Sequence, residues 1–240
     1  MINFFRRIRK KLADDNKPLK YARYAIGEIL LVVVGILIAL SINNWNENSK
    51  TKALELKTLK ELRGDLAQTM NDIRGDSLNF ENIIRSNDII LYHMEEKLAF
   101  HDSLNQHFSG MDFFQTFSIN HNTFDNIRQS GSSLITNDSI RIAISNFYTR
   151  PIYLYKEIEM RVLNEHYENY FKPMIMQAFE IEDKKPLLPK NYLAFMGNSD
   201  YKQVLKYTVF ICSRILNFQR YLLKTIGGLI GEIDREIESF

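Results

Sequence analysis

Residues 25–42 read AIGEILLVVVGILIALSI, an apolar run with one charged residue, Glu28. At a rise of ~1.5 Å per residue, a helix of this length spans roughly 27 Å, about the thickness of the hydrocarbon core of a bilayer. Tyr21 and Tyr24 precede the run and Trp45 follows it, as is typical of aromatic residues at membrane interfaces. The stretch therefore predicts a transmembrane helix.

The residues before this run are strongly basic, although the chain of 240 residues has a net charge of only +2. Residues 1–23 hold eight Lys and Arg against two Asp, so the rest of the chain is mildly acidic. By the positive-inside rule, basic residues beside a span stay in the cytoplasm. We therefore expect a cytoplasmic segment over 1–24, a transmembrane helix over 25–45 in a bacterial inner membrane, and a periplasmic domain over 46–240.

Basic and apolar residues share helical spacing near the N-terminus, the pattern of an amphipathic helix on an anionic lipid surface. The predicted membrane-interface anchors are Arg6, Arg7, Arg9, Lys10, Lys11, Tyr21, Tyr24 and Trp45. This pattern favours the lipid bilayer as partner and argues against nucleic acid. A cleaved signal peptide is the alternative, because Ala39-Leu40-Ser41 fits a cleavage site, but the segment before the run is long for one.

One face of the predicted span carries small and polar residues. At ~100° per residue, that face consists of Glu28, Val32, Gly35, Ala39 and Asn43. Gly35 and Ala39 form a small-xxx-small pair, which lets another helix approach closely. This membrane-association face predicts self-association with Glu28 toward the bundle interior; alternatively, Glu28 extends to the lipid headgroups.

Beyond the span, apolar residues recur in three- and four-residue steps, which indicates an all-α domain. One such seam covers residues 59–73 and a second covers 80–98, so we expect a helical hairpin that turns near Gly75-Asp76. A third seam runs over residues 204–237. Together they predict an antiparallel bundle of long helices.

The segment between these seams contains clear helix start and stop signals. Asn137 is placed to cap a helix that begins at Asp138, and Pro151 should kink or restart that helix. Residues 183–200, which contain two Pro and one Gly, are predicted as the main loop.

The most polar part of the domain is residues 123–133, and we expect one or two helical turns over residues 123–129. Arg128, Ser130 and Gly131 are candidates for a ligand or partner loop. The alternative is structural, with Gly131 ending a helix in the left-handed conformation. Residues 113–119 fit either a short strand or a buried connector.

Three glycines, Gly227, Gly228 and Gly231, interrupt the last seam at a cost of up to ~1 kcal/mol each. Close helix packing is the expected reason, and a hinge or a membrane-facing contact is the alternative.

The sequence contains no motif that points to catalysis, a cofactor or a metal. Cys212 is the only cysteine, the patterns HExxH, CxxC and GxSxG are absent, and the polar segment 123–133 contains no SxxK. His166 lies between Glu165 and Glu168, and we expect it on a solvated helix face. We therefore expect no enzyme activity, no cofactor and no metal site.

The stretches KYARYAIGEIL (20–30) and INNWNE (42–47), with the apolar run between them, resemble the N-terminal signature of an uncharacterised family of membrane-anchored proteins from Bacteroidota-type bacteria. Residues 123–131 with Leu134-Ile135 are similar to a second recurring stretch of that family. The resemblance implies a single-pass envelope protein of unknown function, and it carries over no catalytic residue.

These observations favour an assembly or interaction module, as a homo-oligomer or bound to an envelope protein. The alternative is a periplasmic ligand-sensing bundle, whose signal must pass to a separate partner because about 24 cytoplasmic residues are too few for a catalytic output domain. An enzyme is the third class, and no acid/base pair or nucleophile supports it.

Overall fold

The computed structural model describes residues 18–112, 122–130, 134–183 and 185–240. The chain divides into two units, Met1–Leu54 and Glu55–Phe240, which are described separately below. The predicted strand or connector at 113–119 and the basic anchors Arg6, Arg7, Arg9, Lys10 and Lys11 lie outside the described residues.

The described part of the first unit, residues 18–54, is the beginning of one long helix, α2 (Pro18–Glu96). Its most apolar window is long enough to cross a bilayer, and no part of that window is buried by the rest of the chain. The large aliphatic side chains of residues 26–42 are exposed, which costs free energy in water but not in lipid. This part of α2 is therefore a candidate membrane span.

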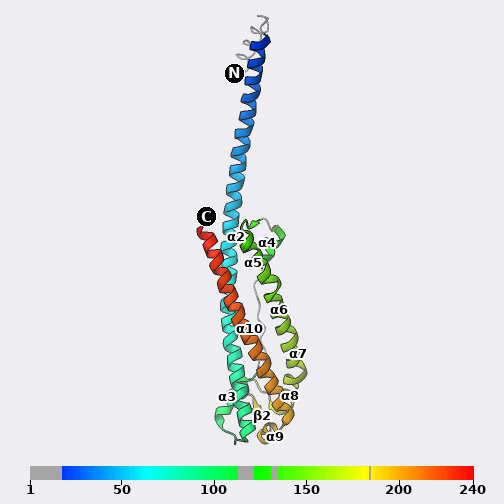
Figure 1. Ribbon diagram of the computed structural model, residues 1–240. Helices are drawn as coiled ribbons and strands as arrows, with labels where there is room; N and C mark the ends of the chain where they lie inside the picture. The colour runs from blue at the N-terminus through cyan, green and yellow to red at the C-terminus, as the bar shows by residue number, and fades with distance from the viewer. Residues whose placement is uncertain (1–17, 113–121, 131–133, 184) are drawn as a thin grey trace. The chain divides into compact units, whose positions relative to one another are not determined.

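The second unit is a bundle of three long rods that lie side by side (Figure 1). They are the later part of α2, the helix α10 (Ser199–Glu238), and a broken rod from Asp138 to Ala178. The broken rod consists of α5 (Asp138–Thr149), α6 (Pro151–Glu157), η3 (Ile158–Leu163), α7 (Asn164–His166), η4 (Tyr167–Phe171) and α8 (Lys172–Ala178). Its segments η3 and η4 are π-helical, so their backbone is locally wider than an α-helix.

Short elements complete the unit. They are η1 (Asp102–Leu104), α3 (Asn105–Gly110), α4 (Asn122–Ser130), β1 (Phe179–Glu180), β2 (Leu188–Pro189) and α9 (Tyr192–Met196). The two strands pair antiparallel, with Phe179 opposite Pro189. The described residues therefore form the all-α fold that the sequence predicts. The two-residue strands β1 and β2 add one minimal β-hairpin to it.

The core lies between the apolar stripes of the three rods. Ion pairs between partly exposed side chains connect α2 and α10 at both ends of the bundle: among them, Arg63 Nε lies 2.7 Å from Asp234, and Lys206 Nζ lies 3.0 Å from Glu95. Because residues early in α2 pair with residues late in α10, the two helices are antiparallel, as expected.

The predicted hairpin near Gly75-Asp76 is wrong, because α2 continues through both residues. The physical reason is the register of the two seams. Ile73 and Phe80 are seven residues apart, close to two helical turns, so both seams lie on one stripe that faces the core. A single helix buries that stripe without a turn.

Other expectations for this region are confirmed. Asn137 caps α5, whose first residue is Asp138, and α6 begins at Pro151. The turns expected over 123–129 are helix α4. The predicted loop over 183–200 is partly wrong, because its described residues also contain β2 and α9.

Candidate functional site

An open groove runs between α10 and the broken rod. Its larger part has a volume of about 760 Å³, and its walls include Ile158, Val162, Tyr207, Phe210, Arg214 and Tyr221. A second part of about 520 Å³, lined by Arg150 and Leu154 among others, shares Phe218 and Tyr221 with the first. We call the two parts together the aromatic groove.

Among the side chains that the structure describes, the charged residues that line the aromatic groove are two arginines, Arg214 and Arg150. The guanidinium carbon of Arg214 lies 5.2 Å from the centroid of the Phe210 ring, a cation–π contact. Across the described ranges, neither arginine forms an ion pair with a carboxylate. The groove therefore combines apolar walls with uncompensated positive charge.

One end of the groove is fixed by His166, which joins α7 to α10. Its Nε2 lies 2.8 Å from Thr208 Oγ1, and the Thr208 hydroxyl donates to the Val204 carbonyl at 3.0 Å. Since that hydroxyl proton is used, Nε2 of His166 is the donor to Thr208. The ring also meets the Tyr207 ring edge to face at 4.9 Å.

The expectation that His166 is solvated is wrong, because only 3% of its surface is exposed. Burial lowers the pKa of His166 to about 4, so the ring is neutral at neutral pH. Glu165 and Glu168 flank it in sequence but point to solvent, because neighbours on a helix do not share a face.

A polar network crosses the middle of the bundle between α2, α6 and α10. Tyr155 donates to Asp76 Oδ2 at 3.2 Å, and Gln219 donates both to Asp76 and, at 2.8 Å, to the Tyr155 hydroxyl oxygen. Ser77 donates to Gln219 Oε1 at 2.8 Å. Burial raises the pKa of the Asp76 carboxyl, whereas the hydrogen bonds from Tyr155 and Gln219 lower it. The network therefore fixes the register of the three rods along the long axis of the bundle.

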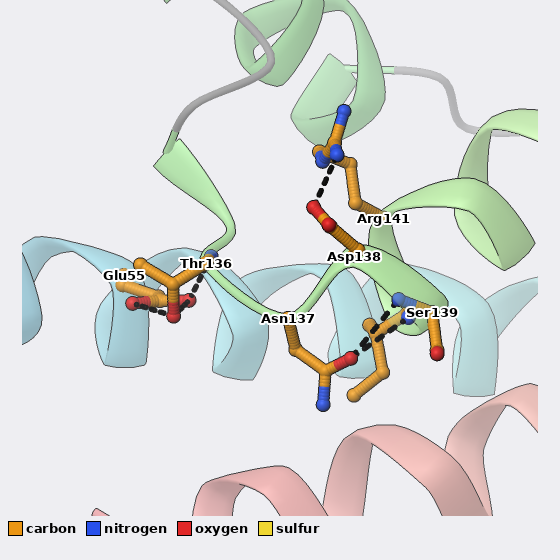
Figure 2. Close-up of polar contacts among 7 residues, drawn as sticks. Glu55, Thr136, Asn137, Asp138, Ser139 and Arg141 are labelled. Carbon is orange, nitrogen blue, oxygen red and sulfur yellow. Dashed lines mark hydrogen bonds and ion pairs between the residues drawn. The ribbon is translucent and has the colours of Figure 1, made fainter.

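A second polar cluster connects the start of α5 to both long helices, and Figure 2 shows its contacts with Glu55 of α2 and within the start of α5. Glu55 of α2, 1% exposed, accepts from the Thr136 backbone N–H at 2.6 Å and from its hydroxyl at 2.9 Å. Asn137 accepts from the backbone N–H groups of Ser139 and Ile140, and donates to Glu236 of α10 at 2.7 Å. One capping residue thereby satisfies the helix start and joins α10.

The sequence prediction missed Glu55, Asp76 and Gln219. A signal for two of them was present, because Glu55 lies four residues before Leu59 and Gln219 lies four after Ile215, in step with buried stripes. Polar residues at apolar stripe positions of this kind indicate buried hydrogen-bonded groups.

The residues of the predicted ligand loop are not brought together with any of these clusters. Arg128 is exposed on α4, Ser130 is the last residue of that helix, and Gly131 lies outside the described residues. The described part of this loop therefore offers no converging polar groups.

The predicted membrane-association face lies along the candidate span. Val32, Gly35, Ala39 and Asn43 are exposed, and Glu28 is partly buried. A Cβ atom placed on Gly35 would meet no atom within 4 Å. Trp45 is exposed, and the side chains of Tyr21 and Tyr24 lie outside what the structure describes.

The expected close packing at Gly227, Gly228 and Gly231 is wrong within this chain. A Cβ atom at any of the three would meet no atom within 4 Å, because their side of α10 faces away from the other two rods. The buried neighbours of these glycines, Ile226 and Leu229, supply the packing here.

In the described ranges, no three His, Cys, Asp or Glu side chains gather closely enough to hold a metal ion. Cys212 is buried, and burial raises the pKa of its thiol to about 12. Its thiolate is therefore scarce at neutral pH.

These features define an all-α protein with one candidate membrane span and a compact helical body. The chain belongs to the family of unknown function DUF6090, which matches residues 28–173. That match covers the candidate span, Glu55, Asp76 and the broken rod up to α8, but not α10. No curated protein and no solved structure matches the chain.

Proposed function

We propose that this protein crosses a bacterial inner membrane once, with its N-terminus in the cytoplasm and residues 46–240 in the periplasm. There it works as an assembly module, a homo-oligomer in the first instance. The basic segment before the span supports this orientation through the positive-inside rule.

The observation that carries the proposal is the open small-residue face of the span. Gly35 and Ala39 lie one helical turn apart, and no atom of the residues that the structure describes lies within 4 Å of a Cβ placed on Gly35. In lipid, helices associate mainly through close packing at such small residues. A second copy of the span would fill this space.

The test is native mass spectrometry of the full chain, extracted gently from its own membrane at native expression level. We expect a homo-oligomer of 28.3 kDa subunits. The double substitution Gly35→Leu with Ala39→Leu should shift the protein to monomer, because two leucines keep the helices apart.

A matched control places similar changes on the opposite face. At ~100° per residue, Val33 and Leu37 lie nearly opposite Gly35, so Val33→Leu with Leu37→Ile should leave the oligomer unchanged. A monomeric wild-type protein, or equal masses for all variants, would reject self-assembly through this face. A fixed complex with a second polypeptide would instead make the protein an accessory subunit.

A further inference from the structure

The aromatic groove exposes an unusual amount of aromatic surface for the side of a helical bundle. About half of the surface of Tyr207, Phe210 and Tyr221 is accessible, all on one side of α10. Apolar surface of this kind, gathered in a hollow and not scattered, indicates a binding surface. Its volume of about 760 Å³ lies in the range of small-molecule sites.

The charge of the groove selects the kind of ligand. The guanidinium of Arg214 lies against the Phe210 ring, which orients it along the wall. A guanidinium binds a carboxylate best, through paired N–H···O bonds. A cationic ligand would be repelled, and a purely apolar one would strip water from Arg214 without replacing its hydrogen bonds.

The length of the groove selects the shape of the ligand. From Arg214 to Thr225, α10 advances eleven residues, roughly 16 Å, beside Phe218 and Tyr221. Asn217 lies one turn after Arg214, and its Oδ1 already accepts from Arg220 at 3.2 Å. The Asn217 amide nitrogen is thus available as a second donor beside the guanidinium. One charged head and one long apolar tail fit this layout.

We infer that the aromatic groove binds a single-chain amphipathic anion, a long-chain carboxylate, with its head at Arg214 and its tail along Phe218 and Tyr221. An acidic helix of another protein would meet the same charge. The fatty acid is favoured because Arg214 lies against the aromatic ring of Phe210, and the groove beyond it is lined mainly by apolar side chains, including Leu154 and Phe218. This binding does not depend on the assembly proposal, and it would also give the ligand-sensing alternative a site.

The test uses the full chain in phosphatidylcholine nanodiscs and a palmitate analogue that carries a diazirine and an alkyne. After irradiation, the labelled peptides are mapped by mass spectrometry. We expect labels on α10 between Phe210 and Thr225 and on the facing η3 or α6. Free palmitate should compete for this labelling, whereas methyl palmitate should not.

Arg214→Gln should lower the labelling of these peptides about tenfold, the loss expected for one charge-assisted hydrogen bond. The matched control is Arg235→Gln, on the same helix, because Arg235 is exposed and lies outside the groove lining. This variant should label as the wild type does. Thermal unfolding of both variants checks that each is folded.

Three results would overturn the inference. Equal labelling of Arg214→Gln and wild type, or equal competition by methyl palmitate, would show that the groove does not recognise a carboxylate head through Arg214. Stronger competition by lysophosphatidylglycerol would assign the groove to a phosphate headgroup instead. Absence of groove labelling together with cross-links from the groove to a second polypeptide would show that a partner helix fills it.

Discussion

Among single residues, His166 couples the fold most directly to pH. Its ring is buried between α7 and α10 and donates to Thr208, and its pKa is lowered to about 4 from an ordinary value of 6.5. The unfolded chain therefore binds a proton at a pH at which the folded chain does not. Stability from this residue is complete above pH 6.5 and is lost as the pH falls toward 4.

The corresponding variant is His166→Gln, whose amide can still donate to Thr208 but does not titrate. Between pH 7 and pH 4.5, the wild-type protein should lose up to about 3 kcal/mol more unfolding free energy than this variant, as the pKa difference implies. Chemical denaturation of the full chain at several pH values measures this difference.

His101→Gln is the control, because His101 is exposed and caps η1. This variant should keep the acid sensitivity of the wild type. If His166→Gln also keeps it, then protonation of His166 is not what destabilises the bundle in acid.

At the scale of elements, the open glycines of α10 predict that a substitution can stabilise the bundle, whereas most substitutions destabilise a protein. Gly228 is exposed, and an added Cβ would touch nothing within 4 Å. Gly228→Ala should therefore stabilise the bundle by about 0.5–1 kcal/mol, because alanine restricts the unfolded helix segment at no packing cost. A thermal melt should show a rise of roughly 2–4 °C per kcal/mol.

Gly110→Ala is the contrasting variant. Its Cβ would lie 2.7 Å from the hydroxyl of Ser86, where α3 approaches α2, so this change should destabilise. A loss of stability in Gly228→Ala, measured on the extracted native complex, would mean that another chain packs against the glycine face.

The same helix shows how far the sequence alone reaches. Its long apolar seam predicts α10 almost to its ends, because burial of one stripe dominates helix stability. Hydrophobicity alone would favour Phe218 over its neighbour Gln219 for the buried stripe, but Gln219 is fully buried and Phe218 is partly exposed on the groove. Periodicity locates a stripe, whereas the choice of a polar residue within it depends on Asp76 and Tyr155, which lie on other rods.

The groove could not be predicted for a related reason. Its walls come from residues near 150–162 and 207–225, and their alignment depends on the register of two rods that a sequence does not state. The π-helical turn of η3 shifts that register further, and no residue pattern marks it. The candidate span, in contrast, rests on local composition alone, so one stretch of sequence was enough.

At the scale of the whole molecule, the orientation across the membrane decides which partners can reach the bundle. The chain is well suited to a cysteine test, because its native Cys212 is buried and its thiol pKa is raised to about 12. A membrane-impermeant maleimide should therefore leave the wild-type protein unlabelled. Leu193→Cys adds a thiol at a position that is 78% exposed on α9.

In spheroplasts, Leu193→Cys should react with the maleimide without lysis if residues 46–240 are periplasmic. Asn16→Cys, in the basic segment before the span, should react only after lysis, because the positive-inside rule keeps that segment in the cytoplasm. The reverse pattern would invert the topology and move both the groove and its expected ligand to the cytoplasm. If the mature protein has a lower intact mass and lacks residue 16, then the N-terminal segment is a cleaved signal peptide and the protein is released from the membrane.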